Sequence, residues 1–237
     1  MSIVFSATNA GIVEQSRSLA RVDSTQWPTQ KIVNSANNWL DFLTGYAIGA
    51  DKRFQWDDTN HTKLPEGTAE LTINVSDYSW LTDEQGNSII TLTGVSRYDG
   101  TYYQPLKLVD RKDPNYDPAT FGMVTGTPSE YDKIADNIIR LDKRPSATVA
   151  SGLKFYFQRT GSYFVAGDTT KSPGVSPLLH RGFVIASAYD IALTLGLSNL
   201  QALGVEREKE EQKVIQYFTD RNQDERKIMT MAKILYI

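Results

Sequence analysis

The chain contains no cysteine and only two histidines, His61 and His180. Without thiols it has neither disulfides nor thiolate metal sites, which is consistent with a reducing compartment. Neither histidine has the spacing of a metal site, such as two histidines four residues apart with a glutamate between them. His61 lies in a polar stretch. His180 begins an apolar one, where a packed or capping side chain is expected.

Long apolar runs and clustered charge of one sign are also absent. No stretch approaches the roughly 18 apolar residues of a transmembrane helix, and residues 1–10 lack the basic start and apolar core of a signal peptide. The net charge is -3, with both signs mixed along the chain, whereas a general nucleic-acid surface needs clustered Lys and Arg. We therefore expect that the chain neither associates with a membrane nor binds DNA tightly.

Catalytic motifs are missing as well: there is no Gly-rich phosphate loop and no nucleophile elbow. Asp57 and Asp58, beside Trp56, form the densest acidic pair, and paired carboxylates can act as acid and base. Adjacent loop residues usually point apart, however, and Asp favours turns. Three further aspartates lack the glycine and glutamate of a calcium loop: Asp110, Asp113 and Asp117. The sequence predicts no enzyme, no cofactor and no metal.

Two surface sets leave a binding role open. Tyr98, Tyr102 and Tyr103, and the aromatic run 155–157, can stack on sugars, although at strand spacing such residues more often form core and interface. Five basic residues on the later strands are typical of a solvated face, and an acidic partner is the alternative. These residues are Arg140, Lys143, Arg144, Lys154 and Arg159.

Hydrophobic periodicity predicts three helices, one N-terminal and two C-terminal. The first opens at Trp27 and Pro28. The second, residues 178–197, is apolar almost all round and should be buried, and the third, 203–221, is charged with a thin apolar stripe. The predicted core of this small bundle consists of Ile32, Trp39, Leu43, Phe183 and Tyr189.

Between the first and second helices the period changes to two, which predicts an inserted antiparallel β-rich unit. The fold class is therefore α+β. The predicted divisions are an extended N-terminal arm (1–26), the helical bundle (27–50 and 175–224), the β-rich unit (51–174) and a C-terminal tail (225–237).

The tail is unusual because it is apolar directly after a strongly charged helix. Such a segment needs a surface to cover it, on its own core or on another chain. We predict a docking tail, whose contact residues are Ile228, Met229, Met231, Ile234, Leu235, Tyr236 and Ile237.

Several segments in a fixed order resemble the head-to-tail adaptors, or neck connectors, of tailed bacteriophages. They are residues 50–65 (ADKRFQWDDTNHTKLP), 126–132 (GTPSEYD), 136–142 (DNIIRLD), 152–159 (GLKFYFQR), 162–164 (SYF), 168–171 (DTTK) and 177–180 (PLLH). Their order and spacing, over roughly residues 27–200, carry the resemblance. One departure is Ala135-Asp136, where the family often has a glycine before the position of Asn137.

The resemblance implies a virion structural protein in the neck, assembled in the cytoplasm of a host bacterium. It implies a ring of about twelve subunits beneath the portal protein, which extends the DNA channel and receives the next neck, stopper or tail protein. DNA slides through without specific binding, which agrees with the net charge. The alternatives are a stopper or tail-completion protein and, in another class, a carbohydrate-binding β-module of the virion.

Overall fold

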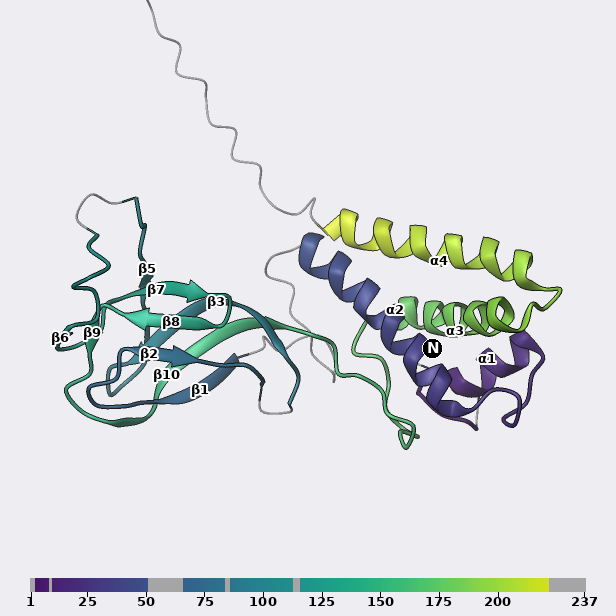
Figure 1. The fold of residues 1–237 in the computed structure, drawn as a ribbon, viewed down its shortest axis with the longest axis horizontal. Helices are drawn as coiled ribbons and strands as arrows, with labels where there is room; N and C mark the ends of the chain where they lie inside the picture. The colour runs from purple at the N-terminus through teal and green to yellow at the C-terminus, as the bar shows by residue number, and fades with distance from the viewer. Residues whose placement is uncertain (1–2, 9, 51–65, 84–85, 113–115, 222–237) are drawn as a thin grey trace, which may run out of the picture.

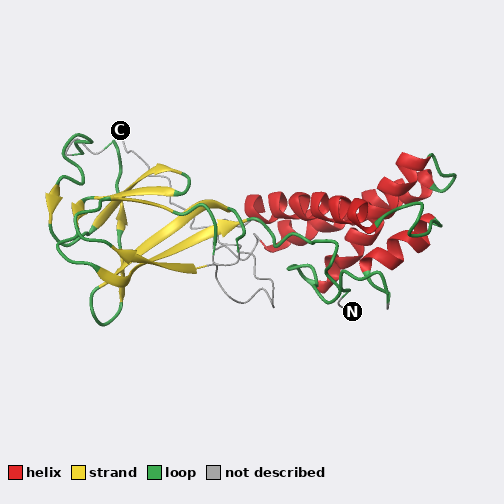
Figure 2. Cartoon of the chain, turned by 60° about the horizontal axis from the view of Figure 1, so that its bottom comes forward, coloured by secondary structure: helices red, strands yellow, loops and turns green. Residues whose placement is uncertain are grey.

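The computed structural model describes the chain except for residues 1–2, 9, 51–65, 84–85, 113–115 and 222–237. The described residues form two lobes that lie end to end, one of helices and one of strands (Figures 1 and 2). The first and last described segments of the chain contribute to the helical lobe, and the central part of the chain forms the β lobe. The fold is therefore α+β, with the strands inserted between two pairs of helices.

The helical lobe is built around α3, which contacts each of the other three helices. The helices are α1 (Ile12–Ala20), α2 (Thr29–Ala50), α3 (His180–Leu195) and α4 (Leu200–Arg221), with a 3-10 turn η1 (Pro177–Leu179) before α3. Gly196 ends α3 in the left-handed conformation, with φ of 63°, a position that favours glycine because it has no Cβ. The segment 177–195 is apolar and long enough to cross a membrane, and its burial among three helices accounts for that composition.

The prediction of an extended arm and a single N-terminal helix was wrong, because residues 12–20 form α1 against α3. Ile12 and Val13 are fully buried, and the Ser16 hydroxyl donates to the carbonyl of Ile12 at 2.7 Å. Before α1, Phe5 stacks on Phe164 at 4.7 Å. Four residues of this helix are buried, and a helix this short depends on its packing for stability.

The main apolar cluster of the helical lobe contains four of the five residues expected in its core. Ile32, Trp39, Leu43 and Phe183 are buried in it, whereas Tyr189 is half-buried beside a smaller cluster of α3 and α4. Trp39 packs on Gly182, where an added Cβ would lie 2.6 Å from the indole ring. A side chain larger than hydrogen at Gly182 would therefore force α2 away from α3.

The β lobe contains two four-stranded sheets, in the orders β1-β10-β3-β4 and β2-β8-β7-β5, and a pair β6-β9. The strands are β1 (Glu66–Leu71), β2 (Asp77–Ser79), β3 (Ile89–Tyr98), β4 (Tyr103–Pro105), β5 (Lys107–Leu108), β6 (Val124–Thr125), β7 (Glu130–Ala135), β8 (Ile138–Leu141), β9 (Lys143–Arg144) and β10 (Val149–Arg159). The expected antiparallel pairing holds for most of them, but β5 pairs with β7 and β6 with β9 in parallel. The two strands of each parallel pair are not consecutive in the chain, so no local hairpin signal marks them.

Alternate residues of β10 supply the centre of the β core. Leu153, Phe155 and Phe157 are buried, and Trp80 stacks on Phe155 at 4.2 Å. Strand β1 ends at Leu71, and Asn74 then turns the chain with φ of 62°. Asparagine tolerates this conformation better than most residues.

The segment after β10 lies on the helical lobe, although the predicted β unit runs to residue 174. The Asn37 side-chain amide donates to the carbonyl of Phe164 at 3.1 Å and accepts from its N–H at 2.9 Å. The Tyr163 hydroxyl donates to Asp41 at 2.6 Å. Phe164 itself is buried among the helices. This segment therefore fastens the exit of the β lobe to α2.

Candidate docking groove between α2 and α4

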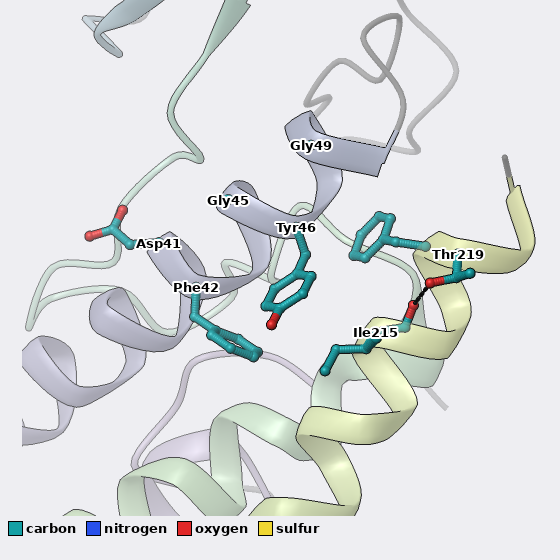
Figure 3. Close-up of a pocket in the computed structure, with 8 residues that line it drawn as sticks. Asp41, Phe42, Gly45, Tyr46, Gly49, Ile215 and Thr219 are labelled. Atoms are coloured by element: carbon teal, nitrogen blue, oxygen red, sulfur yellow. Dashed lines mark hydrogen bonds between the residues drawn. The ribbon is translucent and has the colours of Figure 1, made fainter.

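An apolar groove of about 480 Å³ lies between the C-terminal halves of α2 and α4. Its volume falls within the roughly 300–1,000 Å³ that is typical of ligand pockets. Figure 3 shows Phe42, Tyr46 and Ile215 pointing into the space between the two helices. The lining residues are Asp41, Phe42, Gly45, Tyr46, Gly49, Ile215, Phe218 and Thr219.

The sequence of α2 produces the groove. Leu43 and Ala47 are buried, whereas Gly45 and Gly49, one turn apart, are exposed, and a Cβ added at either would meet nothing within 4 Å. Phe42 stacks on Trp39 at 4.9 Å, which fixes its ring at the edge of the core. The groove is therefore open at the two glycines, which lack side chains, and its wall at Phe42 is held in place by aromatic packing.

The other wall comes from the thin apolar stripe of α4. Phe218 is 2% exposed and belongs to the main cluster, while Ile215 is half-buried. Tyr46, opposite them on α2, is 39% exposed. A tyrosine ring left this open beside two apolar side chains suits contact with a further apolar group.

The polar groups of the groove are few and already bonded. Asp41 accepts from Tyr163, and burial together with this bond raises the pKa of Tyr163 to about 12. The Thr219 hydroxyl donates to the carbonyl of Ile215 within α4 at 2.8 Å. The lining residues include no base beside a nucleophile, so the arrangement favours binding of an apolar segment over chemistry.

The predicted docking tail lies outside the described residues, as do Asp57, Asp58 and His61. The last described residue is Arg221, at the end of α4, two residues beyond the groove residue Thr219. The tail residues in question are Ile228, Met229, Met231, Ile234, Leu235, Tyr236 and Ile237. The chain therefore leaves α4 close to the groove and continues towards its most apolar segment.

His180 is buried and bonded on both ring nitrogens. Its Nδ1 accepts from the N–H of Ile3 at 3.0 Å, and its Nε2 lies 2.9 Å from the carbonyl of Val175. Because Nδ1 accepts, the proton of the neutral ring belongs on Nε2, which then donates to Val175. The ring joins the start of the chain to the start of α3, in the packed role expected for it.

The aspartates considered for calcium serve as turn residues where they are described. Asp110 accepts from the N–H of Lys112, and Asp117 accepts from the N–H of Ala119. No group of three or more potential metal ligands occurs in the described part of the chain. Asp113 lies outside it.

The basic set of the later strands is engaged within the β lobe. Arg140 pairs with Asp77, Lys143 with Asp142, Lys154 with Glu66 and Arg159 with Asp83, and Arg144 donates to the carbonyl of Gly122. Four of these cations are paired with acids and Arg144 is bonded to a carbonyl oxygen, so the set does not form an unpaired basic patch. Of the three tyrosines considered for sugar stacking, Tyr98 and Tyr103 pack on each other, with ring centroids 5.2 Å apart. Tyr102 is 60% exposed.

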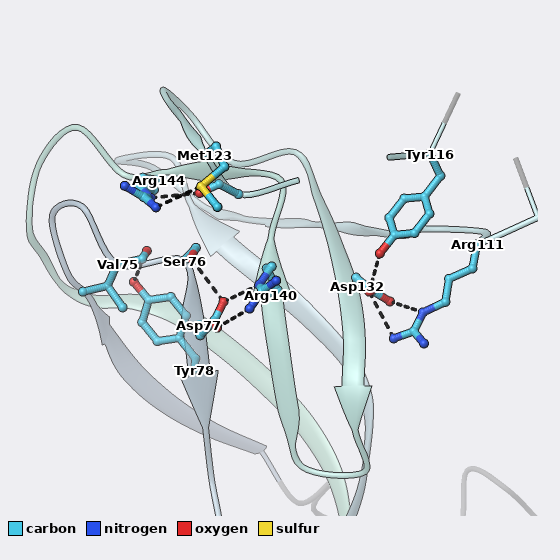
Figure 4. A network of polar contacts seen from close by, with 11 residues as sticks. Val75, Ser76, Asp77, Tyr78, Arg111, Tyr116, Met123, Asp132, Arg140 and Arg144 are labelled. Atoms are coloured by element: carbon cyan, nitrogen blue, oxygen red, sulfur yellow. Dashed lines mark hydrogen bonds and ion pairs between the residues drawn. The ribbon is translucent and has the colours of Figure 1, made fainter. Parts of the chain in front are cut away.

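Two charged networks hold the loops of the β lobe (Figure 4). Arg140 donates twice to Asp77, each at 2.7 Å, and these bonds lower the pKa of Asp77. Arg111 donates to both oxygens of Asp132, and the Tyr116 hydroxyl adds a third bond at 2.7 Å. Burial alone would raise the pKa of Asp132, but the bonds from Arg111 and Tyr116 outweigh it, and the pKa is lowered.

Sequence reasoning missed the groove itself. The predicted core residues of the first helix, Ile32, Trp39 and Leu43, are not among the lining residues. A signal was present, because two glycines four residues apart beside aromatic residues indicate an open helix face. No protein-family model matches this chain, and no curated protein matches it.

Proposed function

We propose that this chain is a structural subunit of the neck of a tailed bacteriophage, a head-to-tail adaptor. It forms a ring of about twelve subunits beneath the portal protein and extends the DNA channel towards the tail. The observation that carries the proposal is the apolar groove beside the end of α4, next to a chain that continues into the apolar residues 228–237. In a subunit of an assembly, both the groove and the apolar segment can form contacts with neighbouring subunits.

The two-lobed shape supports the same proposal. The first two and last two described helices form the helical lobe at one end of an elongated molecule (Figure 1). The β lobe lies at the other end, so each lobe can contact a different neighbour. In the proposed ring, the helical lobe and the tail face the portal, and the β lobe faces the next neck or tail protein.

The charge of the molecule fits a channel through which DNA must slide. The net charge is -3, and the basic residues of the later strands are paired with acids or with a carbonyl group. Strong contacts to phosphates would hold the DNA in place and depend steeply on salt. A ring of these subunits offers a weakly repelling wall instead.

In this proposal residues 228–237 dock on the portal. An extended segment can add a strand to an exposed edge, or an amphipathic helix can lie in a groove, and in either mode the apolar side chains set the register. Deleting residues 228–237 should leave the rest of the chain folded and abolish its binding to the portal.

The test is a mass measurement of the purified chain, alone and after mixing with the portal protein of the same virion. The proposal predicts a complex in which a ring of chains joins one portal, and no complex for the chain that lacks residues 228–237. A full-length chain that stays monomeric and never joins the portal contradicts the proposal. Binding only to a stopper or tail protein would assign the chain to the next layer of the neck.

A further inference from the structure

We propose that, in the free subunit, the groove between α2 and α4 holds the apolar C-terminal segment of the same chain, residues 228–237. The groove has apolar walls from Phe42, Tyr46 and Ile215. The segment supplies eight apolar or aromatic residues of matching character. This inference concerns the isolated chain and does not rest on the proposed function.

The connection between α4 and residues 228–237 is long enough for this segment to reach the groove. Along α4 the rise is about 1.5 Å per residue, so Ile215 lies roughly 9 Å from Arg221. Residues 222–227 can span up to about 20 Å when extended, which is enough to turn back and reach the groove. These six residues (NQDERK) are all polar or charged, so they suit a solvated connection.

The tether also favours the same chain over a second copy. A segment joined by a short connection has an effective concentration in the millimolar range. A second copy reaches that level only in very concentrated solution or in a closed ring. In a dilute subunit the groove is therefore filled by its own tail.

Two details of α2 agree with an occupant. Gly45 and Gly49 are unfavourable inside a helix, yet no described atom lies within 4 Å of a Cβ added at either position. A segment packed close to the helix backbone would explain why glycine stands there. In addition, Asp41 lies at the groove, and Lys233 is the one cation of the segment 228–237, so their charges are complementary.

The other neighbouring segment fits less well. Residues 51–65 also begin beside the groove, since they follow α2. Their apolar residues are few, and they are separated by Lys, Arg, Asp and His. The predominantly apolar stretch at residues 228–237 is the better match for apolar walls.

Disulfide trapping tests the proposal directly, because the natural chain has no cysteine. Gly45→Cys is combined in the full chain with Met231→Cys, Ile234→Cys or Leu235→Cys, so that the register is sampled. Gly49→Cys, which also has free space, provides a second anchor if the first variant folds poorly. The matched control anchor is Lys213→Cys on α4, which is half-exposed and lies outside the groove lining.

After mild oxidation, the expected result is an intramolecular disulfide in the monomer for at least one groove pair, at several times the yield of the Lys213→Cys control. Adding Tyr46→Asp to the best pair should lower the yield severalfold. Crosslinked dimers would show that a second copy fills the groove and would overturn the proposal. Equal yields from groove and control anchors, or no disulfide from either groove anchor, would also overturn it.

Discussion

The two lobes are stabilised in different ways. The helical lobe has one apolar cluster that reaches from Phe5 to Phe218 and joins residues from both ends of the chain. The β lobe has a smaller apolar cluster, and charged pairs such as Arg159–Asp83 and Arg111–Asp132 close its loops. Packing depends little on pH or salt, whereas ion pairs depend on pH. The two lobes should therefore fail under different conditions.

The largest expected effect is a loss of packing in the helical lobe. Trp39 is 3% exposed and fills the space left by Gly182. Trp39→Ala should lower the free energy of unfolding by about 3–5 kcal/mol, with little change on acidification. Urea unfolding followed by helical circular dichroism measures the loss, and Tyr102→Ala, at an exposed position, is the matched control. A loss below about 1 kcal/mol would show that Trp39 does not pack as described.

Next comes the buried ion pair of the β lobe. Arg159 lies 3.2 Å from Asp83, and their side chains are 6% and 3% exposed. Arg159→Met should cost about 3 kcal/mol, because it leaves a buried carboxylate without its cation. Asp83 keeps bonds from the backbone and side chain of Asn87, which limits the loss.

The double variant Arg159→Met, Asp83→Leu separates charge from packing in that pair. Removing both charges should recover part of the stability, since no unpaired charge is then buried. Chemical denaturation of the wild type, the two single variants and the double variant gives the coupling energy. Losses that simply add would mean that the pair does not interact.

A smaller effect is expected at Asp132, and it depends on pH. The pKa of Asp132 is lowered in the folded state, so its contribution is present above the ordinary Asp pKa near 4 and is lost as pH falls through the folded value. Asp132→Asn should cost about 1–3 kcal/mol at pH 7. It should also flatten the fall in stability between pH 5 and pH 2. Thermal unfolding across this range checks both statements, and an unchanged slope would contradict them.

The smallest effect concerns the groove. Gly45→Ala should stabilise a chain that lacks residues 228–237 by about 0.5–1 kcal/mol, because alanine favours the helix and its Cβ meets no described atom. In the full chain the gain should be smaller, since the new methyl group meets the bound segment. Equal gains in the two backgrounds, measured by thermal unfolding, would mean that nothing packs over Gly45.

Strong local periodicity made part of the fold predictable. The apolar face of α2 and the apolar length of α3 were visible because the same spacing recurs over several turns. α1 was missed because it is short, although its buried residues recur at helical spacing. Its helix depends on contacts with α3 that lie far away in the sequence.

The candidate site could be predicted only in part. The apolar tail is evident in the sequence, but a groove exists only where two distant helices meet, so Tyr46 and Ile215 could not be paired from spacing alone. The charged pairs of the β lobe were also hidden, because Arg111 and Asp132 are brought together by a long loop. Composition showed both charges without showing that they neutralise each other.

Negative-stain imaging of the full chain mixed with the portal protein of the proposed virion tests the central claim most directly. The account predicts a ring of chains on one end of the portal, with the helical lobes against the portal and the β lobes directed away from it. The ring should be absent for the chain that lacks residues 228–237. Portals that remain bare in the presence of the full chain, or rings attached through the β lobes, would contradict the account.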